Sequence, residues 1–249
     1  MNRSADLAKP HEVLIRKLRE HSRVSAEDLA ELSRLPYQRR HLAANEDLIR
    51  QGDAPDVIAL VISGLVGRYH LLRDGRRQYL SFHMRGDLPD AQSLFLERMD
   101  HAVCAIGEAE MVLIPHKQCL KLFERRPMVG FAIWRETLID ASIFRQAITN
   151  NSGRSARARM AHLFCEIFYR ARSSGLASGD SCELPLSQTQ IGETLGMAIA
   201  TVSRTLQALR RAGLIEFKSG RLTVKDWHRL AIDGDFNPEY LHLKRAVRI

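Results

Sequence analysis

Four side chains in the stretch Ile199–Arg211 have the types and the spacing needed to contact DNA. Ala200, Ser203, Arg204 and Gln207 stand at positions i, i+3, i+4 and i+7, which share one face of a helix. A guanidinium, a hydroxyl and an amide are groups that hydrogen-bond to base edges and phosphates. The stretch therefore predicts a helix with a polar face suited to a nucleic acid.

Two apolar stripes must position this polar face. The apolar residues recur at the helical spacing of three, four and seven: Ile191, Leu195, Val202, Leu206 and Leu209. Gly196 interrupts the pattern, where a turn residue able to adopt a positive φ is needed. Two such stripes around a glycine turn predict a helix-turn-helix.

A β-hairpin is predicted directly after the second helix. Two β-prone runs, 214–217 and 222–224, flank Ser219-Gly220, which is a hairpin turn signal. A hairpin in this place makes a winged helix, whereas the alternative is an ordinary helical hairpin with solvated arginines. The candidate DNA-binding residues are Ser187, Gln188, Thr189, Ile199, Ala200, Thr201, Ser203, Arg204, Gln207, Arg210, Lys218 and Arg221.

The charge distribution agrees with a polyanionic partner. The 249 residues carry a formal net charge of +8. Residues 153–230 hold twelve Lys/Arg against six Asp/Glu, whereas residues 1–152 hold 22 against 20. The basic excess thus coincides with the predicted winged helix.

Several other classes of protein find little support in the sequence. No apolar run could span a bilayer and the charged N-terminus does not resemble a signal peptide, so we expect a cytoplasmic protein without a membrane partner. No G-x-S-x-G, H-E-x-x-H or P-loop motif occurs, so we expect no enzyme. Cys104, Cys119, Cys165 and Cys182 form no C-x-x-C pair, which predicts buried reduced thiols and no metal site.

The first half of the chain changes from helical to β-rich. Residues 1–34 look helical, Ser25 begins a helix with acidic residues in its first turn, and Pro36 is expected to end it. Asp74-Gly75 signals a hairpin. The short strands expected between Tyr37 and Pro115 favour an antiparallel barrel or jelly roll. They are 39–42, 57–62, 65–72, 78–83, 102–106 and 111–114.

A long helix is predicted from Met128 to about Asn150. Its apolar seam follows alternating steps of three and four residues, with one polar member: Phe131, Trp134, Leu138, Ala141, Arg145 and Ile148. Such a seam favours a partner helix and hence a dimer, and the alternative is packing against its own domain. Asn150–Gly153 is expected to break the helix as a hinge.

A further helix is expected from Arg154 to about Arg172, followed by a Ser- and Gly-rich loop that leads into the helix-turn-helix. The C-terminal end of the chain shows little apolar periodicity. Trp227, Leu230 and Ile232 are candidates to pack back on the winged domain, and the rest is a candidate mobile tail.

This order of elements, together with local motifs, resembles the Crp–Fnr family of bacterial transcription regulators over nearly the whole chain. The stretch 45–53, NEDLIRQGD, is similar to the family's G-x-x-[IL]-x-x-x-G-D, with Asn45 in the usual Gly place. The sequences VISG at 61–64, RGD at 85–87 and AIGEAEMVLIP at 105–115 resemble later parts of the same domain. IGETLG at 191–196 and TVSR at 201–204 match its helix-turn-helix closely.

The resemblance implies an α+β protein. It would combine an N-terminal antiparallel β-barrel or jelly roll of the cyclic-nucleotide-binding type, a long dimerisation helix and a C-terminal winged helix-turn-helix. It also implies a homodimer on a two-fold DNA operator, with RNA polymerase and an unknown small-molecule effector as candidate partners. The expected segments are an N-terminal helical part (1–36), an effector domain (37–126), a dimerisation helix (127–152), a DNA-binding domain (153–232) and a tail (233–249).

The effector region departs from the family pattern. Nucleotide-binding members carry an Arg-Ser pair in the phosphate loop, where this chain has Met99-Asp100, and their Gly-Glu sugar-binding stretch is replaced by 88–92, LPDAQ. A carboxylate repels a phosphate, so we expect no cyclic AMP binding and name no cofactor. The candidate effector-pocket residues are Arg85, Gly86, Asp87, Arg98, Met99 and Asp100.

Two alternative effectors remain open. Arg98 could replace the usual phosphate contact, which would give a cyclic-nucleotide-responsive regulator. A haem-based gas sensor is the other alternative, with four histidines in or beside the strands and none favoured as ligand: His70, His83, His101 and His116. The family's N-terminal cysteine cluster for oxygen sensing is excluded, because Cys104 is the first cysteine of the chain.

The residues expected to contact the bases also depart from the family pattern. Ile199 and Ala200 stand where family members carry an Arg and a Glu. Alanine cannot accept a hydrogen bond from cytosine, so these two residues are limited to apolar contacts such as a thymine methyl. Ala198 lacks a capping side chain, so Thr201 is expected to cap a helix that starts later.

Overall fold

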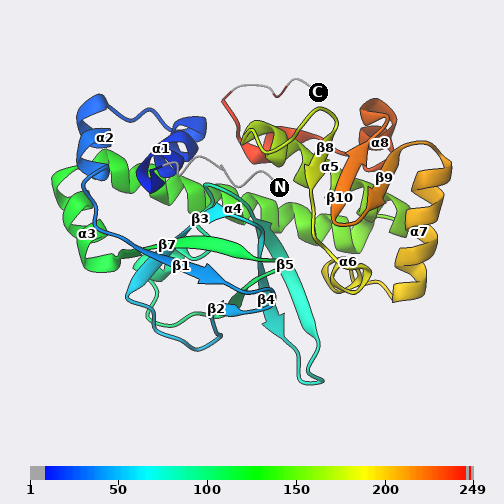
Figure 1. The fold of residues 1–249 in the computed structure, drawn as a ribbon, viewed down its shortest axis with the longest axis horizontal. Helices are drawn as coiled ribbons and strands as arrows, with labels where there is room; N and C mark the ends of the chain where they lie inside the picture. Colours follow the sequence, from blue (N-terminus) through cyan, green and yellow to red (C-terminus); the bar gives the residue numbers. More distant parts are fainter. Residues whose placement is uncertain (1–8, 245–246, 248–249) are drawn as a thin grey trace. The chain divides into compact units, whose positions relative to one another are not determined.

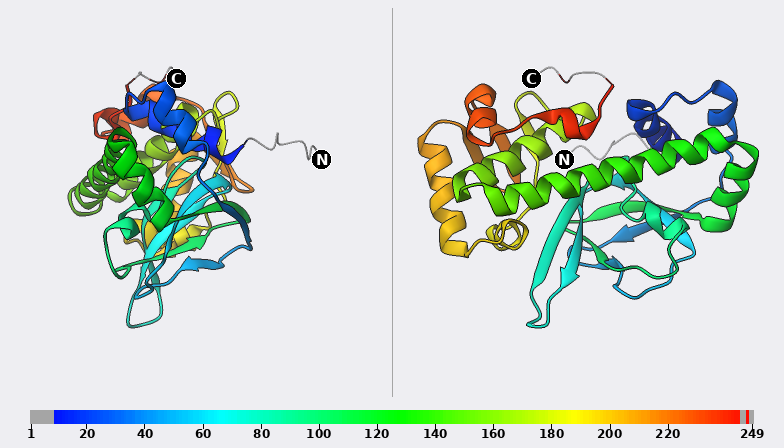
Figure 2. Two further views of the ribbon diagram at one scale, coloured as in Figure 1. Left: turned by 90° about the vertical axis from the view of Figure 1, so that its left-hand side faces the viewer. Right: turned by 180° about the vertical axis from the view of Figure 1, so that it is seen from behind.

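The computed structural model describes residues 9–244 and residue 247. Its helices and strands are shown in Figures 1 and 2. They form two compact units, which we treat separately. The N-terminal unit contains the chain up to Arg68 and His83–Leu138, and the C-terminal unit contains Tyr69–Phe82 and the chain from Ile139 onward.

Two short helices open the N-terminal unit. They are α1 (Pro10–His21) and α2 (Ala26–Leu32). The predicted start at Ser25 is confirmed, because its hydroxyl accepts the Asp28 N–H and the Asp28 carboxylate accepts the Ser25 N–H, a reciprocal capping box. The helix ends at Leu32, before the expected stop at Pro36.

Seven strands follow, one more than predicted, because Asp47–Ile49 was not expected to form one. Three of their pairings are antiparallel, as predicted. They are β1 (Gln38–Leu42), β2 (Asp47–Ile49), β3 (Val57–Ser63), β4 (Val66–Leu71), β5 (Arg77–His83), β6 (Ala102–Ala105) and β7 (Ala109–Pro115). One sheet has the order β1-β7-β3 and the other β2-β6-β4-β5. Both sheets send side chains into one core, which includes Leu42, Ile49, Val61, Met99, Val103 and Met111.

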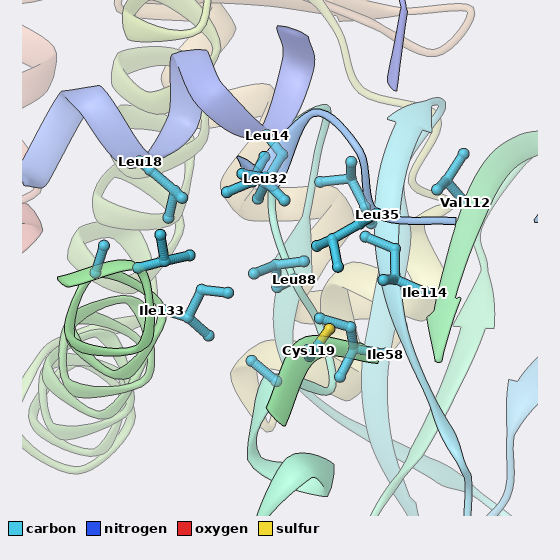
Figure 3. Packing of buried hydrophobic residues seen from close by; sticks show 14 of the residues in the cluster. Leu14, Leu18, Leu32, Leu35, Ile58, Leu88, Val112, Ile114, Cys119 and Ile133 are labelled. Atoms are coloured by element: carbon cyan, nitrogen blue, oxygen red, sulfur yellow. The ribbon is translucent and has the colours of Figure 1, made fainter. Parts of the chain in front are cut away.

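The opposite face of β3 and β7 is covered by helices. These are α1, α2, α3 (His116–Arg125) and the beginning of α4. Figure 3 shows Leu14, Leu18, Ile58, Ile114 and Ile133 among the side chains of this second core. Alternation along β3 explains the two cores, because neighbouring residues of a strand point to opposite sides.

The long helix α4 (Pro127–Gly153) runs further than predicted. The expected break at Asn150–Gly153 is wrong, because polar side chains of the last turns bond within the unit. The Ser152 hydroxyl donates to the Ile148 carbonyl at 2.7 Å, and the Asn151 amide donates to the Thr194 carbonyl at 3.1 Å. Asn151 and Ser152, which are of types that favour turns, are thus part of the last turn of α4.

The C-terminal unit contains the winged helix. Its elements are α5 (Ala156–Ser173), β8 (Ser181–Glu183), α6 (Gln188–Leu195), α7 (Ile199–Arg211), β9 (Ile215–Lys218), β10 (Arg221–Val224), α8 (Trp227–Asp233) and the 3₁₀ turn η2 (Pro238–Leu241). The sheet order is β8-β10-β9. Phe164 and Phe168 of α5 are fully buried, and the Phe164 ring packs on Phe217 of β9 with centroids 5.6 Å apart.

The end of the chain is more ordered than its pattern suggests. Leu230 is buried, but Ile232 is 65% exposed and does not pack back, contrary to the expectation. Residues beyond α8 also pack, because Leu241 of η2 is buried in a cluster with aromatic side chains. The expected mobile tail is therefore wrong for the described residues up to Leu243.

Two further expectations concern the burial of the cysteines and the absence of a membrane-spanning segment. All four cysteines are buried, and burial raises the pKa of the Cys119 and Cys182 thiols to about 12. Within the described residues, no helix combines the length and the apolarity needed to cross a membrane.

Candidate nucleic-acid interface

The turn between α6 and α7 is fixed by two glycines. Gly196 ends α6 in the left-handed conformation, with φ of +63°, as the sequence predicts. Gly192 faces the turn so closely that an added Cβ would lie 2.6 Å from the Met197 carbonyl oxygen. The turn thus packs against α6 at a distance that only a glycine permits.

The start of α6, at the other end of the helix from this turn, also presents polar groups. Ser187 accepts the Gln190 N–H at 3.1 Å, and the Gln190 side chain accepts the Ser187 N–H at 2.9 Å. This capping box occupies the Ser187 hydroxyl and leaves Gln188 and Thr189 exposed at the first turn. Gln188 and Thr189 can therefore reach a phosphate beside the groove.

The helix α7 begins at Ile199, so the expected later start at Thr201 is wrong. The Ala198 carbonyl accepts the N–H groups of Thr201 and Val202, which starts the helix without a side-chain cap. An uncapped helix N-terminus offers N–H groups and a partial positive charge to an anion. A DNA phosphate suits this position.

The register of α7 agrees with the predicted helical wheel. Val202, Leu206 and Leu209 are at most 1% exposed. On the other side, Ala200, Arg204 and Gln207 are exposed and Ser203 is half-buried. The Arg204 guanidinium has a long contact of 3.4 Å with the Thr201 hydroxyl.

Ile199 is 56% exposed at the beginning of the same helix. Exposing a large apolar side chain to water is unfavourable. The exposure of Ile199 therefore suits a surface that another molecule covers. Together with Ala200, it provides an apolar edge beside the polar face of α7. That edge can contact a thymine methyl but cannot hydrogen-bond to a base.

The wing has the predicted turn. Ser219 and Gly220 both have positive φ, +50° and +71°, which is the pattern of a type I′ hairpin. Lys218 and Arg221 flank this turn and are exposed. Arg210 has an additional structural contact, because its guanidinium donates to the Phe217 carbonyl and ties the end of α7 to β9.

An apolar stripe runs along α4. Phe131, Trp134, Leu138 and Ile148 are 50–68% exposed, whereas Ala141 is half-buried and Arg145 is exposed. The opposite side of α4 is buried, through Val129, Ile133, Ile139 and Ile143. Among the described residues, the large apolar side chains of the predicted seam are therefore exposed.

The candidate effector residues do not gather in one place. Gly86 and Asp87 lie against α1, where the Asp87 carboxylate is 3.0 Å from the Lys17 ammonium. Met99 is buried in the core, and the exposed Arg98 donates to the Gly52 carbonyl at 3.0 Å. Of the remaining two, Arg85 is half-buried, and Asp100 contacts His101.

A cavity of about 340 Å³ lies instead between the β-strands of the N-terminal unit. Ile49, Ala59 and Leu113 contribute to its wall, together with the Asp90 carboxylate. One Asp90 oxygen accepts the Ala59 N–H at 2.8 Å, and the other is buried with no hydrogen-bond partner among the described residues. Burial raises the pKa of Asp90 to about 7.

A buried arginine stands next to this carboxylate. Arg68 is 1% exposed, and its guanidinium donates to the Pro89 carbonyl. Neither Arg68 nor Asp90 is among the site residues predicted from the sequence. The available signal was a lone arginine in the β-prone run Val66–Leu71, since a charge in a buried strand requires a partner.

Two of the candidate haem histidines are engaged in hydrogen bonds. The ring nitrogens of His101 contact Asp100 at 2.6 Å and Gln92 at 3.1 Å, and His116 contacts the Ser93 hydroxyl at 3.0 Å. Iron ligation by His101 would require breaking one of these contacts.

Comparisons with known proteins match both halves of the chain. Residues 39–126 match the cyclic nucleotide-binding domain family, and residues 158–231 match the Crp-like helix-turn-helix domain family. The chain is 27% identical over 216 residues to the transcriptional activator protein FnrL of Cereibacter sphaeroides, which covers 84% of this chain and 85% of FnrL.

Two further proteins extend the similarity. The nitrogen fixation regulation protein FixK of Bradyrhizobium diazoefficiens is 28% identical over 205 residues, covering 81% of this chain and 85% of FixK. The solved structure of FixK2 from Bradyrhizobium japonicum superposes with a TM-score of 0.71 at 25% identity, covering 80% of this chain and 97% of that one.

Proposed function

Because the chain belongs to the Crp/Fnr family of DNA-binding transcription regulators, we propose that it binds a two-fold symmetric operator as a homodimer. The observation that carries this proposal is the polar face of α7, behind an uncapped helix N-terminus and beside an exposed basic wing. In this role the protein works in the cytoplasm without catalysing a reaction. RNA polymerase is a further proposed partner at the promoter.

Each protomer inserts α7 into the major groove. Arg204 and Gln207 reach base edges, and Ser203 lies on the same face. Lys218 and Arg221 of the wing contact the flanking phosphates. Ile199 and Ala200 favour a base pair with a thymine methyl over one that requires a hydrogen-bond acceptor from the protein.

The apolar stripe of α4 forms the dimer seam. Its alternating spacing of three and four residues suits two helices packed with interdigitating side chains. Four large apolar side chains that are half or more exposed make an isolated protomer unfavourable in water. A parallel pair of α4 helices gives the two-fold axis that a palindromic operator requires.

Selection from a random duplex pool tests this function. We expect the purified protein to enrich a two-fold symmetric sequence with half-sites roughly one helical turn of about 10 base pairs apart. Titration at fixed salt should then show tighter binding to the enriched site than to a scrambled duplex, by about 1000-fold or more. Equal affinity for both duplexes would contradict sequence-specific regulation.

The effector domain does not take cyclic AMP in this proposal. By the family resemblance, Asp90 lies in the stretch that binds the sugar, and Met99-Asp100 replaces the pair that binds the phosphate. The Asp90 carboxylate is buried at the cavity, and Arg68 is already bound to the Pro89 carbonyl. The nucleotide phosphate itself would meet the Asp100 carboxylate where the resemblance places the Arg-Ser pair of the family.

Calorimetry tests the effector directly. Cyclic AMP and cyclic GMP are expected to give no saturable heat up to about 1 mM, equivalent to binding weaker than about −4 kcal/mol. The variant Arg98→Ala should behave like the wild type. Micromolar binding that disappears in Arg98→Ala would establish the alternative in which Arg98 holds the phosphate.

A further inference from the structure

The chain beyond α8 crosses the joint between α4 and α5, within the C-terminal unit. We propose that residues 233–243, the C-terminal strap, hold this joint in one geometry and so fix the orientation of α5 on the C-terminal half of α4. The joint itself is short, since α4 ends at Gly153 and α5 begins at Ala156. Figure 1 shows the last coloured part of the chain beside α5.

Apolar side chains attach the strap to both helices. Ile139 and Ile143 of α4 are 7% and 8% exposed, and they form one cluster with Tyr169 of α5 and Leu241 of η2. The partly buried members of this cluster complete the contact: Trp227, Phe236, Tyr240, Leu243 and Val247. The helices α4, α5 and α8 and the strap therefore share one small core.

Polar contacts fix the position of the strap along α5. The Tyr240 hydroxyl donates to the Glu166 carboxylate at 2.8 Å, and the Tyr240 ring stacks on His162 with centroids 6.0 Å apart. His162 Nδ1 lies 3.0 Å from the Gly234 carbonyl oxygen. A carbonyl oxygen only accepts, so His162 Nδ1 donates to it, and burial lowers the pKa of His162.

One arginine connects the joint itself to the strap. Arg154 lies between the two helices, and its guanidinium donates to the Asp235 carboxylate at 2.8 Å and to the Asp235 carbonyl at 3.2 Å. The same guanidinium is 3.5 Å from the Asn150 side-chain oxygen in the last turns of α4. A rotation at the joint would have to break these contacts together with the apolar cluster.

The consequence for regulation rests on the proposed function. A ligand can re-aim the recognition helices only by favouring one arrangement over another. Residues 233–243 raise the free energy of every arrangement in which α5 leaves α4, because the shared core must then be exposed to water. The strap thereby sets how far the winged helix can be re-aimed at this joint.

A larger side chain at Gly234 is expected to displace the strap from α5. An added Cβ would lie 2.7 Å from the His162 nitrogen and 2.9 Å from the Ala161 carbonyl carbon, which are backbone atoms of α5. The φ of Gly234 is −85°, so a larger residue meets no backbone strain and acts through this collision alone. Gly234→Leu should lift the strap, and Tyr240→Phe should weaken it while keeping the ring.

Hydrogen exchange of the full-length protein without DNA tests the proposal. In Gly234→Leu we expect the amides of residues 150–156 and 235–243 to exchange about tenfold faster or more, with α6 and α7 unchanged. Tyr240→Phe should show a smaller change at the same amides. Ile232→Ser alters a side chain on α8 that is 65% exposed and should match the wild type.

The possible outcomes distinguish a failure of the strap proposal from a failure of the proposed function. Unchanged exchange at residues 150–156 while residues 235–243 exchange faster overturns the strap, as does unchanged exchange of both segments in both variants. Because no DNA is present, this result does not depend on operator binding. Failure of the wild type to prefer any duplex would overturn the function and leave the exchange result standing.

Discussion

The variant Leu138→Glu is expected to be monomeric and to bind the selected operator about 100-fold more weakly or worse, the low end of the gain from linking two binding modules. Leu138 is 50% exposed in the middle of the α4 stripe. In a symmetric helix pair, a glutamate there would face its own copy, so like charges would meet in an apolar seam. The loss of dimers removes the second half-site contact.

Sedimentation velocity at micromolar concentration, together with operator titration, checks this result. Leu120→Glu is the matched control, because Leu120 is 38% exposed on α3, away from the stripe of α4. It introduces the same charge at an exposed leucine and should remain dimeric with full affinity. A Leu138→Glu protein that stays dimeric would show that the seam lies elsewhere.

The second large effect is expected from Arg204→Ala. Loss of one bidentate base contact should weaken binding to the selected operator by about 1–3 kcal/mol, with little change on unrelated duplex DNA. The exposed position of Arg204 in the middle of the outward face of α7 is the physical reason. Specificity should relax at one base pair of each half-site.

Lys218→Ala provides the contrasting variant, because Lys218 lies on the wing and is expected to contact a phosphate. It should weaken selected and scrambled duplexes equally and reduce the salt slope of binding by about one per contact. Titrations of both duplexes at several salt concentrations separate the two variants. An equal loss on both duplexes for Arg204→Ala would reassign Arg204 to the DNA backbone.

The winged helix could be predicted from the sequence because its signals are local and mutually consistent. Gly196 takes the left-handed conformation that its place in the pattern requires, and Ser219-Gly220 forms the expected hairpin turn. The helical periodicity placed Val202 and Leu206 inside α7. The antiparallel strands were predicted for the same reason, although β2 and β8 have three residues each and are too short to show alternation.

Other features depend on contacts between residues far apart in the chain. Asn151 looks like a helix breaker, but its bond to the Thr194 carbonyl extends α4. The strap residues show little apolar periodicity in the sequence. Their position depends on distant contacts, such as the hydrogen bond from Tyr240 to Glu166, 74 positions earlier in the chain. The effector candidates were chosen by alignment with a motif, whereas the cavity is lined by Asp90 and strands that come together only in the fold.

The uncapped start of α7 has a thermodynamic consequence. Free protein leaves the first-turn amides at Ala198 and Ile199 to water, and a phosphate would replace that water in the complex. Folding and DNA occupancy are then linked equilibria, so operator duplex should raise the melting temperature as its concentration exceeds the dissociation constant. Operator DNA would thus stabilise the folded form of the element that reads it.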